Sequence, residues 1–306
     1  MLVTVFTPSF NRAHTIRRVY DSLLGQTVKD FEWIIVDDGS SDGTEELVQS
    51  WITEGILPIL YVRQRNKGKF RTLIETIDRA NGEWFLIADS DDEFVPETIA
   101  TFLSAYNDVP DEKKDCISGV TGLVMDSETR EVIGRQFPIP EEERYLLASV
   151  NDIIYRSGIT GEKWGILKTS VLKEFSAIIP VPEDVKYIGE QALWATISEK
   201  YLTVFINVPL RIYYQGTSDT LSSRNITGRY PLGAWITERT VLPCIWRYLW
   251  YQPRMIFFSL VKLNYASFLA GKSFLQTVNG FPTGLKMLMM LARPAGYVAK
   301  LKYPKK

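Results

Sequence analysis

Two residue types on which many catalytic and metal sites depend are scarce in this 306-residue sequence. It contains two cysteines, Cys116 and Cys244, and one histidine, His14. Two cysteines in a chain of this length argue against a disulfide scaffold, no CxxC pair indicates a zinc site, and a reducing compartment fits best. The single histidine excludes histidine-rich metal sites, and we expect His14 to be a structural or surface residue early in a helix.

Long apolar runs and glycine-rich nucleotide motifs are also missing. No window offers ~18 uncharged apolar residues, so a membrane-spanning helix is not expected. The first ten residues, MLVTVFTPSF, lack the basic and apolar regions of a signal peptide and predict a strand. No GxGxxG follows this strand and no GxxxxGKS/T occurs anywhere, which disfavours a dinucleotide site and a P-loop NTPase. We therefore expect a cytoplasmic protein.

Acidic residues are absent from the last part of the sequence. All 36 Asp and Glu residues lie at or before Glu238, whereas 11 Lys and Arg residues and no acid follow from Arg239 onward. The first 238 residues carry a net charge of −12 and the remainder carries +11, although the whole chain is at −1. Such asymmetry points to an anionic partner for the basic segment.

The first 90 residues alternate short apolar runs with helical periodicity. This β-α-β order predicts an α/β fold with a mostly parallel sheet and helices on both of its faces. Ser41 or Asp42 is expected to cap the second helix. A further helix is expected after Gly189. The pattern predicts strands at 2–8, 31–37, 57–63, 83–89 and 202–214, and helices at 13–27, 41–52 and 69–80.

A polar segment follows each of the first four predicted strands. These segments read TPSFNR, DDGSSDGT, RQRNKGK and DSDD. Ligands of open α/β sheets bind outside the carboxyl ends of the strands, so we expect the four segments to meet on one rim. Asp89 and Asp91 are two residues apart at a strand end, which puts both side chains on one side.

The acidic residues of this rim allow two interpretations each. Mg²⁺ takes one or two carboxylates and fills its shell with water and substrate phosphates, so the DxD pattern predicts a metal-diphosphate site. The alternative is a solvated Asp-rich turn, which the meeting of four polar loops disfavours. Asp37 and Asp38 can accept hydrogen bonds from a nucleoside, or form an Asx turn beside the Ser41 and Asp42 cap.

Several of these stretches resemble glycosyltransferase family 2. They are VTVFTPSFNR, QTVKDFEWIIVDDGSSDGT and RNKGKFRTLIETIDRANGEWFLIADSDD, which cover residues 2–95 densely and in the family's order. The likeness thins through 95–180 and returns at KWGILKTSVL and YIGEQALWATISEKY. It implies an inverting transferase with a GT-A fold in residues 1–238, with a nucleotide-binding half (1–95) and an acceptor half (96–238). Residues 240–306 show no usable likeness to the family, and their composition predicts that 239–306 forms a helical, basic and aromatic extension.

The resemblance also implies roles for single residues. Asp38 would hydrogen-bond the base, usually uracil, with Asp37 as a second nucleotide-binding acid. Asp91, with Asp89, would bind Mn²⁺ or Mg²⁺. The remaining residues implied to bind the nucleotide-sugar are Pro8, Phe10, Asn11, Arg12, Gly68, Arg71, Asp89, Ser90 and Asp92.

An inverting transfer also needs a carboxylate that takes the proton of the acceptor hydroxyl. Glu190 is the candidate, because Gly189 permits a close turn and a helix N-terminus favours an anion. The family often has Glu-Asp here with the second acid as base, whereas this sequence has Gln191. Glu190 could instead merely cap its helix, and Asp184 and Glu162 are the reserve acids.

Three further features have two interpretations each. Trp164 and Asp184 are acceptor-site candidates, and Trp164 could equally be a core residue. Residues 215–224, QGTSDTLSSR, have the composition of a lid over the site or of an ordinary surface loop. Residues 239–306 mix aromatic and basic residues, which favours an anionic membrane surface over nucleic acid, or a helical subdomain packed on the acidic part.

Together these observations predict a metal-dependent inverting glycosyltransferase. The expected donor is a UDP-sugar, the expected acceptor is a saccharide or lipid-linked saccharide, and the expected setting is surface-polysaccharide synthesis. The expected location is the inner face of the cell membrane, as a peripheral protein. The alternatives are a nucleotidyltransferase, which would normally carry a glycine-rich basic loop after the first strand, and an inactive glycan-binding or scaffold protein.

Overall fold

The computed structural model describes residues 1–214 and 226–303, and the chain forms two compact units. The first unit comprises residues 1–149, 159–176 and 201–217, and the second comprises residues 150–158, 177–200 and 218–306. The domain boundary expected after residue 238 falls inside the helix α9 (Pro231–Ile245). The predicted lid, 215–224, lies outside the described residues.

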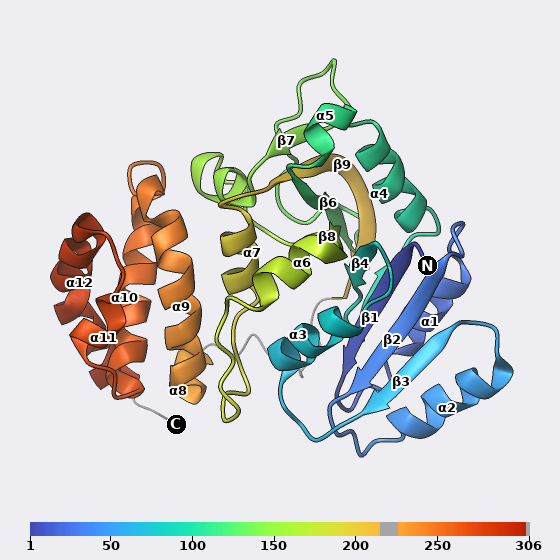
Figure 1. The fold of residues 1–306 in the computed structure, drawn as a ribbon, viewed down its shortest axis with the longest axis horizontal. Coiled ribbons are helices and arrows are strands. Elements are labelled where there is room, and N and C mark those ends of the chain that lie inside the picture. Colours follow the sequence, from blue (N-terminus) through green and yellow to red (C-terminus); the bar gives the residue numbers. More distant parts are fainter. Residues whose placement is uncertain (215–225, 304–306) are drawn as a thin grey trace. The chain divides into compact units, whose positions relative to one another are not determined.

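The first unit is built on one mixed sheet (Figure 1). Its strands lie in the order β3-β2-β1-β4-β8-β6-β9-β5, and β7 pairs with β9. The first four strands are parallel to one another, whereas β8 is antiparallel to both β4 and β6. The strands are β1 (Val3–Ser9), β2 (Phe31–Asp37), β3 (Ile59–Arg63), β4 (Trp84–Ile87), β5 (Glu93–Phe94), β6 (Ile117–Asp126), β7 (Leu146–Ala148), β8 (Lys163–Lys168) and β9 (Leu202–Tyr213).

The central strands are apolar on both faces because helices cover both. Every residue of β2 is buried, and in β1 only Pro8 is half-buried. Successive side chains of a strand point to opposite faces, so Val5 and Phe6 of β1 enter different layers. The helices of this unit are α1 (Arg17–Leu24), α2 (Thr44–Glu54), α3 (Lys69–Arg79), α4 (Thr98–Asn107), α5 (Asp111–Lys114) and α6 (Thr169–Ser176).

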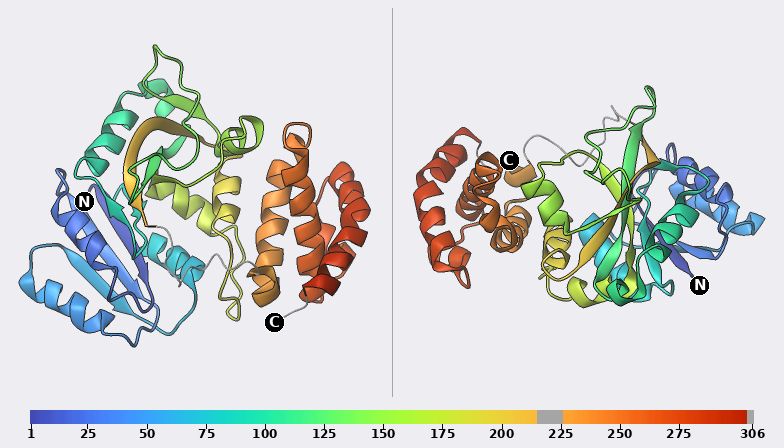
Figure 2. Two further views of the ribbon diagram at one scale, coloured as in Figure 1. Left: turned by 180° about the vertical axis from the view of Figure 1, so that it is seen from behind. Right: turned by 90° about the horizontal axis from the view of Figure 1, so that it is seen from above.

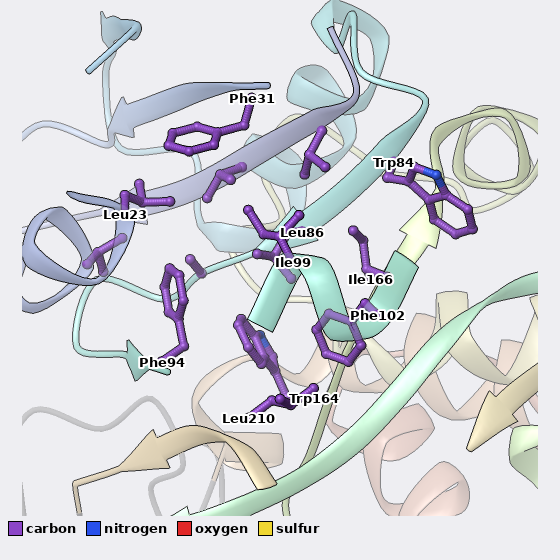
Figure 3. Packing of buried hydrophobic residues seen from close by; sticks show 14 of the residues in the cluster. Leu23, Phe31, Trp84, Leu86, Phe94, Ile99, Phe102, Trp164, Ile166 and Leu210 are labelled. Carbon is purple, nitrogen blue, oxygen red and sulfur yellow. The ribbon is translucent and has the colours of Figure 1, made fainter. Parts of the chain in front are cut away.

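An apolar core joins α1, α2 and α4 to one face of the sheet. Phe94 and Phe102 pack against Trp164, with ring centroids 5.3 and 5.8 Å away (Figure 3). The indole N–H of Trp164 donates to the Ile87 carbonyl at 2.6 Å. This packing continues the core up to the carboxyl end of β4, and it thereby positions the loop that carries the predicted DxD motif.

The second unit is helical in its described part. Here α10 lies between α9 and α12, and both neighbours pack on it (Figure 2). A capping box at Ser273, reciprocated by Gln276, starts α11. No helix within the described ranges is both long enough and apolar enough to span a bilayer. Besides α9, the helices are α7 (Gln191–Ile197), α8 (Ile226–Arg229), α10 (Pro253–Leu269), α11 (Phe274–Val278) and α12 (Thr283–Lys302).

Candidate functional site

Four parallel strands end at one edge of the sheet in the first unit. Ser9 at the end of β1 is the register partner of Asp37 at the end of β2, and Asp37 is in turn the partner of Arg63 at the end of β3. On its other side β1 pairs with β4, so the connections leave β1 in opposite directions. Such a switch point is where open α/β sheets bind ligands. The four polar loops predicted to meet on one rim therefore do so.

Asn11 joins the loops that follow β1 and β2. Its backbone N–H donates to Ser40 Oγ at 2.8 Å, and its Oδ1 accepts from the Ser41 N–H at 2.8 Å. Asn11 adopts φ 55°, a left-handed conformation that asparagine tolerates better than most residues. The neighbouring Phe10 is 47% exposed and Arg12 is half-buried. The bonds of Asn11 hold this loop in a fixed shape and leave an aromatic side chain accessible beside it.

Asp37 is committed to the turn that follows β2. It is fully buried, its Oδ1 accepts from the Ser40 N–H at 2.7 Å, and its Oδ2 accepts from the Tyr61 hydroxyl at 2.6 Å. Burial and this hydrogen bond raise the pKa of Tyr61. Gly39 has φ 91°, which a side chain would strain, and completes the turn. The Asp37 side chain therefore closes this turn from a buried position through the N–H three residues on, whereas the two-residue hydrogen bond of an Asx turn is made by Asp42, from the Thr44 N–H.

Asp38 joins the turn after β2 to the loop after β3. Its Oδ1 accepts from Gln64 Nε2 at 3.0 Å and from the Lys67 N–H at 2.8 Å, and its Oδ2 accepts from the Gly68 N–H at 2.7 Å. A carboxylate offers about four acceptor positions, so three bonds leave capacity for one more donor. Gly68, at φ 88°, precedes the first turn of α3, where Arg71 is half-buried.

The expected N-cap of α2 is displaced. The helix begins at Thr44, and its N-cap is Gly43 at φ 85° rather than Ser41 or Asp42. Asp42 still contributes, because its Oδ1 accepts from the backbone N–H of Thr44 at 3.2 Å and from its hydroxyl at 2.6 Å. Its Oδ2 accepts from the Ala13 N–H at 3.0 Å. Asp42 therefore ties the start of α2 to the loop after β1.

The carboxylates after β4 have different environments. Asp92 is 2% exposed, and its Oδ1 lies 2.5 Å from Arg211 Nη2. Its Oδ2 accepts from the Asp89 N–H at 2.9 Å. Asp89 is half-buried, and its Oδ1 lies 2.7 Å from Lys69 Nζ. Ser90 is buried and Asp91 is half-buried. A single loop thus holds two acids in ion pairs with residues from distant elements.

Burial and charge separate the pKa values of these two acids. Burial raises the pKa of Asp92 to about 8, against the opposing effect of the Arg211 guanidinium and with a further increase from Asp89 and Asp91. Burial alone would also raise the pKa of Asp89, but Lys69 and Arg211 outweigh it and hold that pKa below its usual value. The cluster is therefore balanced by specific cations and not by water alone.

Lys69 and Arg211 were not identified from the sequence. Lys69 opens α3, in a segment singled out only for Gly68 and Arg71. Arg211 is a single charged residue in an otherwise apolar stretch of β9, and such a residue is buried only when it is paired. That isolated charge is the one signal from which its role could have been inferred.

Arg18 fixes the backbone beside the same carboxylates. Its Nη1 donates to the Asp91 carbonyl at 3.4 Å, and its guanidinium lies 3.7 Å from the centroid of the Tyr214 ring. The Tyr214 hydroxyl donates to Glu93. This arrangement connects α1, the end of β9 and the residue that follows Asp92.

The donor set suits a hard divalent cation. Within residues 1–214 and 226–303, no side chain donates a hydrogen bond to the Asp91 carboxylate or forms an ion pair with it. Nor do three or more acidic, histidine or cysteine residues of these ranges form a ready-made cage. One or two carboxylates completed by water and phosphate oxygens is the arrangement that Mg²⁺ usually takes. The residues therefore fit a metal that is bound together with its substrate.

The remaining candidates lie apart from this loop in the chain. Trp164 is 7% exposed and belongs to the core described above, so its predicted stacking on an acceptor stays a prediction. Glu162, two residues earlier, is exposed, and its charge adds to those of Asp92 and Asp89 in raising the pKa of Arg211, although burial opposes this increase. Glu162 is therefore close enough to Arg211 for its charge to act on the guanidinium.

Glu190 and Asp184 belong to the second unit. Glu190 is the N-cap residue of α7, but its side chain makes no capping hydrogen bond there. Just before it, the Gly189 N–H donates to Thr237 Oγ1 of α9 at 2.8 Å. Asp184 is exposed. The hydrogen bond that would define Glu190 as a helix cap is therefore not observed, and the role of Glu190 as catalytic base remains a prediction.

Comparisons with known proteins identify relatives by sequence. A family model described as Glycosyl transferase family 2 matches residues 4–158, which is just over half of the chain. The putative teichuronic acid biosynthesis glycosyltransferase TuaG of Bacillus subtilis is 26% identical over 72% of this chain and 82% of its own length. The GalNAc(5)-diNAcBac-PP-undecaprenol beta-1,3-glucosyltransferase of Campylobacter jejuni is 26% identical over 76% of this chain and 71% of its own length.

Solved structures share the fold. S. aureus TarS 1-349 in complex with UDP-GlcNAc superimposes with a TM-score of 0.62 at 16% identity, covering 97% of this chain and 88% of that 1-349 chain. Mannosyltransferase PcManGT from Pyrobaculum calidifontis, in complex with GDP-Man and Mn²⁺, gives a TM-score of 0.53 at 18% identity, covering 99% of this chain and 88% of its own. The predicted α/β fold of GT-A type with a helical C-terminal part is confirmed.

The three hydrogen bonds of Asp38 generate a first prediction. Asp38→Asn places an amide N–H₂ against backbone N–H donors of the loop at 64–68, so we expect a loss of about 1–3 kcal/mol of unfolding free energy without any ligand. Urea denaturation measures this loss. Asp78→Asn is the matched control, because Asp78 is exposed on α3 and its substitution should change stability little. Equal stability of both variants would contradict the anchoring role of Asp38.

The buried pair of Asp92 and Arg211 generates a second prediction. In Arg211→Met the Asp92 carboxylate loses its cation, so its pKa rises further and the folded state must bind a proton. A raised carboxyl pKa makes stability fall as pH increases. We expect unfolding free energy to drop by about 3–5 kcal/mol at pH 9 and by less at pH 6. The double variant Arg211→Met with Asp92→Asn should lose this additional pH dependence, and its persistence would rule out the pair as the cause.

Proposed function

Because this chain belongs to glycosyltransferase family 2, we propose that it transfers a sugar from a nucleotide-sugar, in particular a UDP-sugar, to a saccharide or lipid-linked saccharide with inversion. The observation that carries the proposal is the rim on which four strand-end loops meet. On it, Asp91 is held by its backbone, and its carboxylate is engaged by no side chain of residues 1–214 and 226–303, whereas Asp89 and Asp92 on either side are paired. A nucleoside diphosphate with a divalent cation matches such a site.

The nucleotide would lie across the loops that follow β1, β2 and β3. Asp38 would accept a hydrogen bond from the base, for which uracil offers an N–H, using the acceptor capacity that its three protein bonds leave. Phe10 has the exposed ring for contact with the base. Asp37 would act by holding the turn, since its side chain is fully buried. The other residues proposed to line the nucleotide-sugar are Pro8, Asn11, Arg12, Gly68, Arg71, Ser90 and Asp92.

A divalent cation, Mn²⁺ or Mg²⁺, would be held by Asp91 with Asp89. When bound, it would offset the charge that builds on the departing diphosphate. Asp89 keeps its Oδ1 in the ion pair with Lys69, and its Oδ2 lies outside that pair. Arg211 and Arg18 would hold the loop in the shape that presents Asp91 to the ligand. The Mn²⁺ in the PcManGT structure supports a metal of this class.

The acceptor hydroxyl would attack the anomeric carbon as the bond to the diphosphate breaks. Glu190 would take the hydroxyl proton, so that it ends on the Glu190 carboxyl while the diphosphate leaves with the electron pair. Glu162 is the competing acid, because it is exposed and its charge acts on Arg211, the partner of Asp92. Trp164 and Asp184 remain the proposed acceptor contacts.

The relatives support a setting in bacterial surface-polysaccharide synthesis. One is named for teichuronic acid biosynthesis and another for a saccharide linked to undecaprenol diphosphate. We therefore propose that this protein acts at the cytoplasmic face of the cell membrane. The basic residues 239–306 would hold it there, because an anionic leaflet attracts each Lys or Arg near the surface by about 1 kcal/mol.

Nucleotide binding can be tested by thermal denaturation with UDP, GDP, CMP and ADP, each with and without Mn²⁺. A ligand of the folded state raises its stability by mass action, about 2.7 kcal/mol at a hundredfold excess over Kd. We expect UDP with Mn²⁺ to give the largest shift and Asp91→Asn to abolish its metal-dependent part. No shift with any of the four nucleotides would contradict the proposed site.

The identity of the base can be tested with matched amide variants. Glu190→Gln removes the proton acceptor and keeps the shape, so we expect kcat to fall by about 10²–10⁴-fold while the UDP shift is retained. Glu162→Gln and Asp184→Asn are the comparison variants and should retain most of their turnover. If Glu162→Gln alone abolishes turnover, then Glu162 and not Glu190 is the base.

A further inference from the structure

The outward face of α12 is apolar along its whole length. Six large apolar side chains of this helix are between 48% and 76% exposed. At 3.6 residues per turn they fall on one continuous face about 120° wide. Exposed apolar surface of this extent marks an interaction site. The six residues are Met287, Met290, Leu291, Tyr297, Val298 and Leu301.

The opposite face of α12 is fixed against α10. A side chain at Gly296 would place its Cβ 2.5 Å from Asn264 Cβ, so only glycine permits this close approach. The Asn264 Nδ2 donates to the Met289 carbonyl at 3.0 Å. These contacts determine the rotation of α12 about its own axis, so the apolar outward face cannot turn into the bundle.

A row of basic residues runs beside the apolar face. Lys286, Arg293 and Lys300 are spaced by seven residues, which places them almost above one another along the helix. From Arg239 to the end of the sequence, no acidic residue offsets them. An apolar face bordered by lysine and arginine is the pattern of a helix that lies in a membrane interface.

A hollow of about 480 Å³ lies where this border meets α10. Phe268 of α10 and Met290, Arg293, Pro294 and Tyr297 of α12 line it. The Arg293 guanidinium lies 4.7 Å from the Phe268 ring centroid. Its Nη1 is shielded from water and has no hydrogen-bond partner within the described ranges. The hollow thus combines apolar walls with a guanidinium that forms no ion pair with a carboxylate of the described ranges.

The Lys300 Nζ adds a second positive charge at the hollow, 5.9 Å from the Phe268 ring centroid and 5.8 Å from that of Tyr297. A phospholipid, in which hydrocarbon lies next to a phosphate, matches both the apolar walls and the positive charges. A second copy of this chain would bring an identical basic row against the first, and like charges oppose such a contact. Nucleic acid would satisfy the cations but would leave the apolar face exposed to water.

We propose that the outward face of α12 lies in the surface of an anionic phospholipid bilayer. The Arg293 hollow would receive a lipid phosphate together with the beginning of its hydrocarbon chain. This inference rests on the membrane association proposed above and names the surface that makes it. Binding needs no turnover, because α12 contains none of the residues assigned to sugar transfer.

The test is flotation of the full-length protein with vesicles of phosphatidylglycerol and phosphatidylcholine, and with phosphatidylcholine alone. We expect the wild-type protein to float with the mixed vesicles. The variant Leu291→Asp with Val298→Asp should partition into the mixed vesicles more than tenfold less than the wild-type protein. Its two exposed apolar side chains are replaced by carboxylates, which the anionic lipids repel. Ile56→Asp is the matched control, since Ile56 is 62% exposed on the first unit, and it should bind as wild type does.

Arg293→Gln tests the hollow separately. Phosphatidylcholine also carries a phosphate, so loss of the Arg293 cation should weaken binding to both vesicle types, by about fivefold for the mixed vesicles. Millimolar inorganic phosphate should not compete, because the proposed ligand includes the hydrocarbon. A loss confined to the mixed vesicles, which general charge attraction alone would produce, or displacement by free phosphate, would overturn the lipid-phosphate site.

Two further outcomes would overturn the surface itself. One is binding that the double aspartate variant leaves unchanged. The other is a wild-type protein that binds no vesicle but self-associates in sedimentation, with the double variant monomeric, which would make this face an interface between copies. The UDP shift of the same variants reports on the transferase site, so failure of the lipid proposal and failure of the proposed function are distinguishable.

Discussion

The acidic rim depends on the burial of Asp92. A carboxyl group that is 2% exposed needs a partner inside the protein, and Arg211 provides it from β9, far along the chain. In the sheet, β9 pairs with β5, where Phe94 is the register partner of Arg211. The pairing of the short strand β5 with β9 therefore brings the guanidinium to the carboxyl group. The loop after β4 is therefore held in shape by β9, which lies more than a hundred residues further along the chain.

This constraint explains how three acids can follow one strand. Each has a different neighbour: Asp89 has Lys69, Asp92 has Arg211, and the Asp91 backbone has Arg18. The first two cations reduce the repulsion that would otherwise force water or protons into the cluster. The same logic extends around the rim, where Asn11, Asp38 and Asp42 link neighbouring loops through backbone N–H groups. A ligand would meet a surface whose polar groups are already oriented, which lowers the cost of ordering them on binding.

The sequence was informative wherever a local pattern decides the structure. Apolar runs at 2–8, 31–37 and 57–63 became β1, β2 and β3 within two residues, because strands buried on both faces must be apolar throughout. The parallel order then required their polar ends to share an edge. The N-cap of α2 was misplaced because Gly43, in a left-handed conformation, separates Asp42 from the helix. Local composition could not reveal that conformation.

Reasoning from local sequence patterns could not predict partners that are distant in the sequence. Nothing near Asp92 in the chain indicates Arg211, and nothing near Asp38 indicates that the loop at 64–68 would donate to it. Helix α12 shows the same limit in another form. Its sequence is apolar on two sides, and periodicity cannot tell which side is buried. Gly296 decides, because the absent side chain lets α10 approach there and leaves the larger apolar residues outside. The position of Gly296, and not the position of the most hydrophobic residues, therefore determines which face of α12 is exposed.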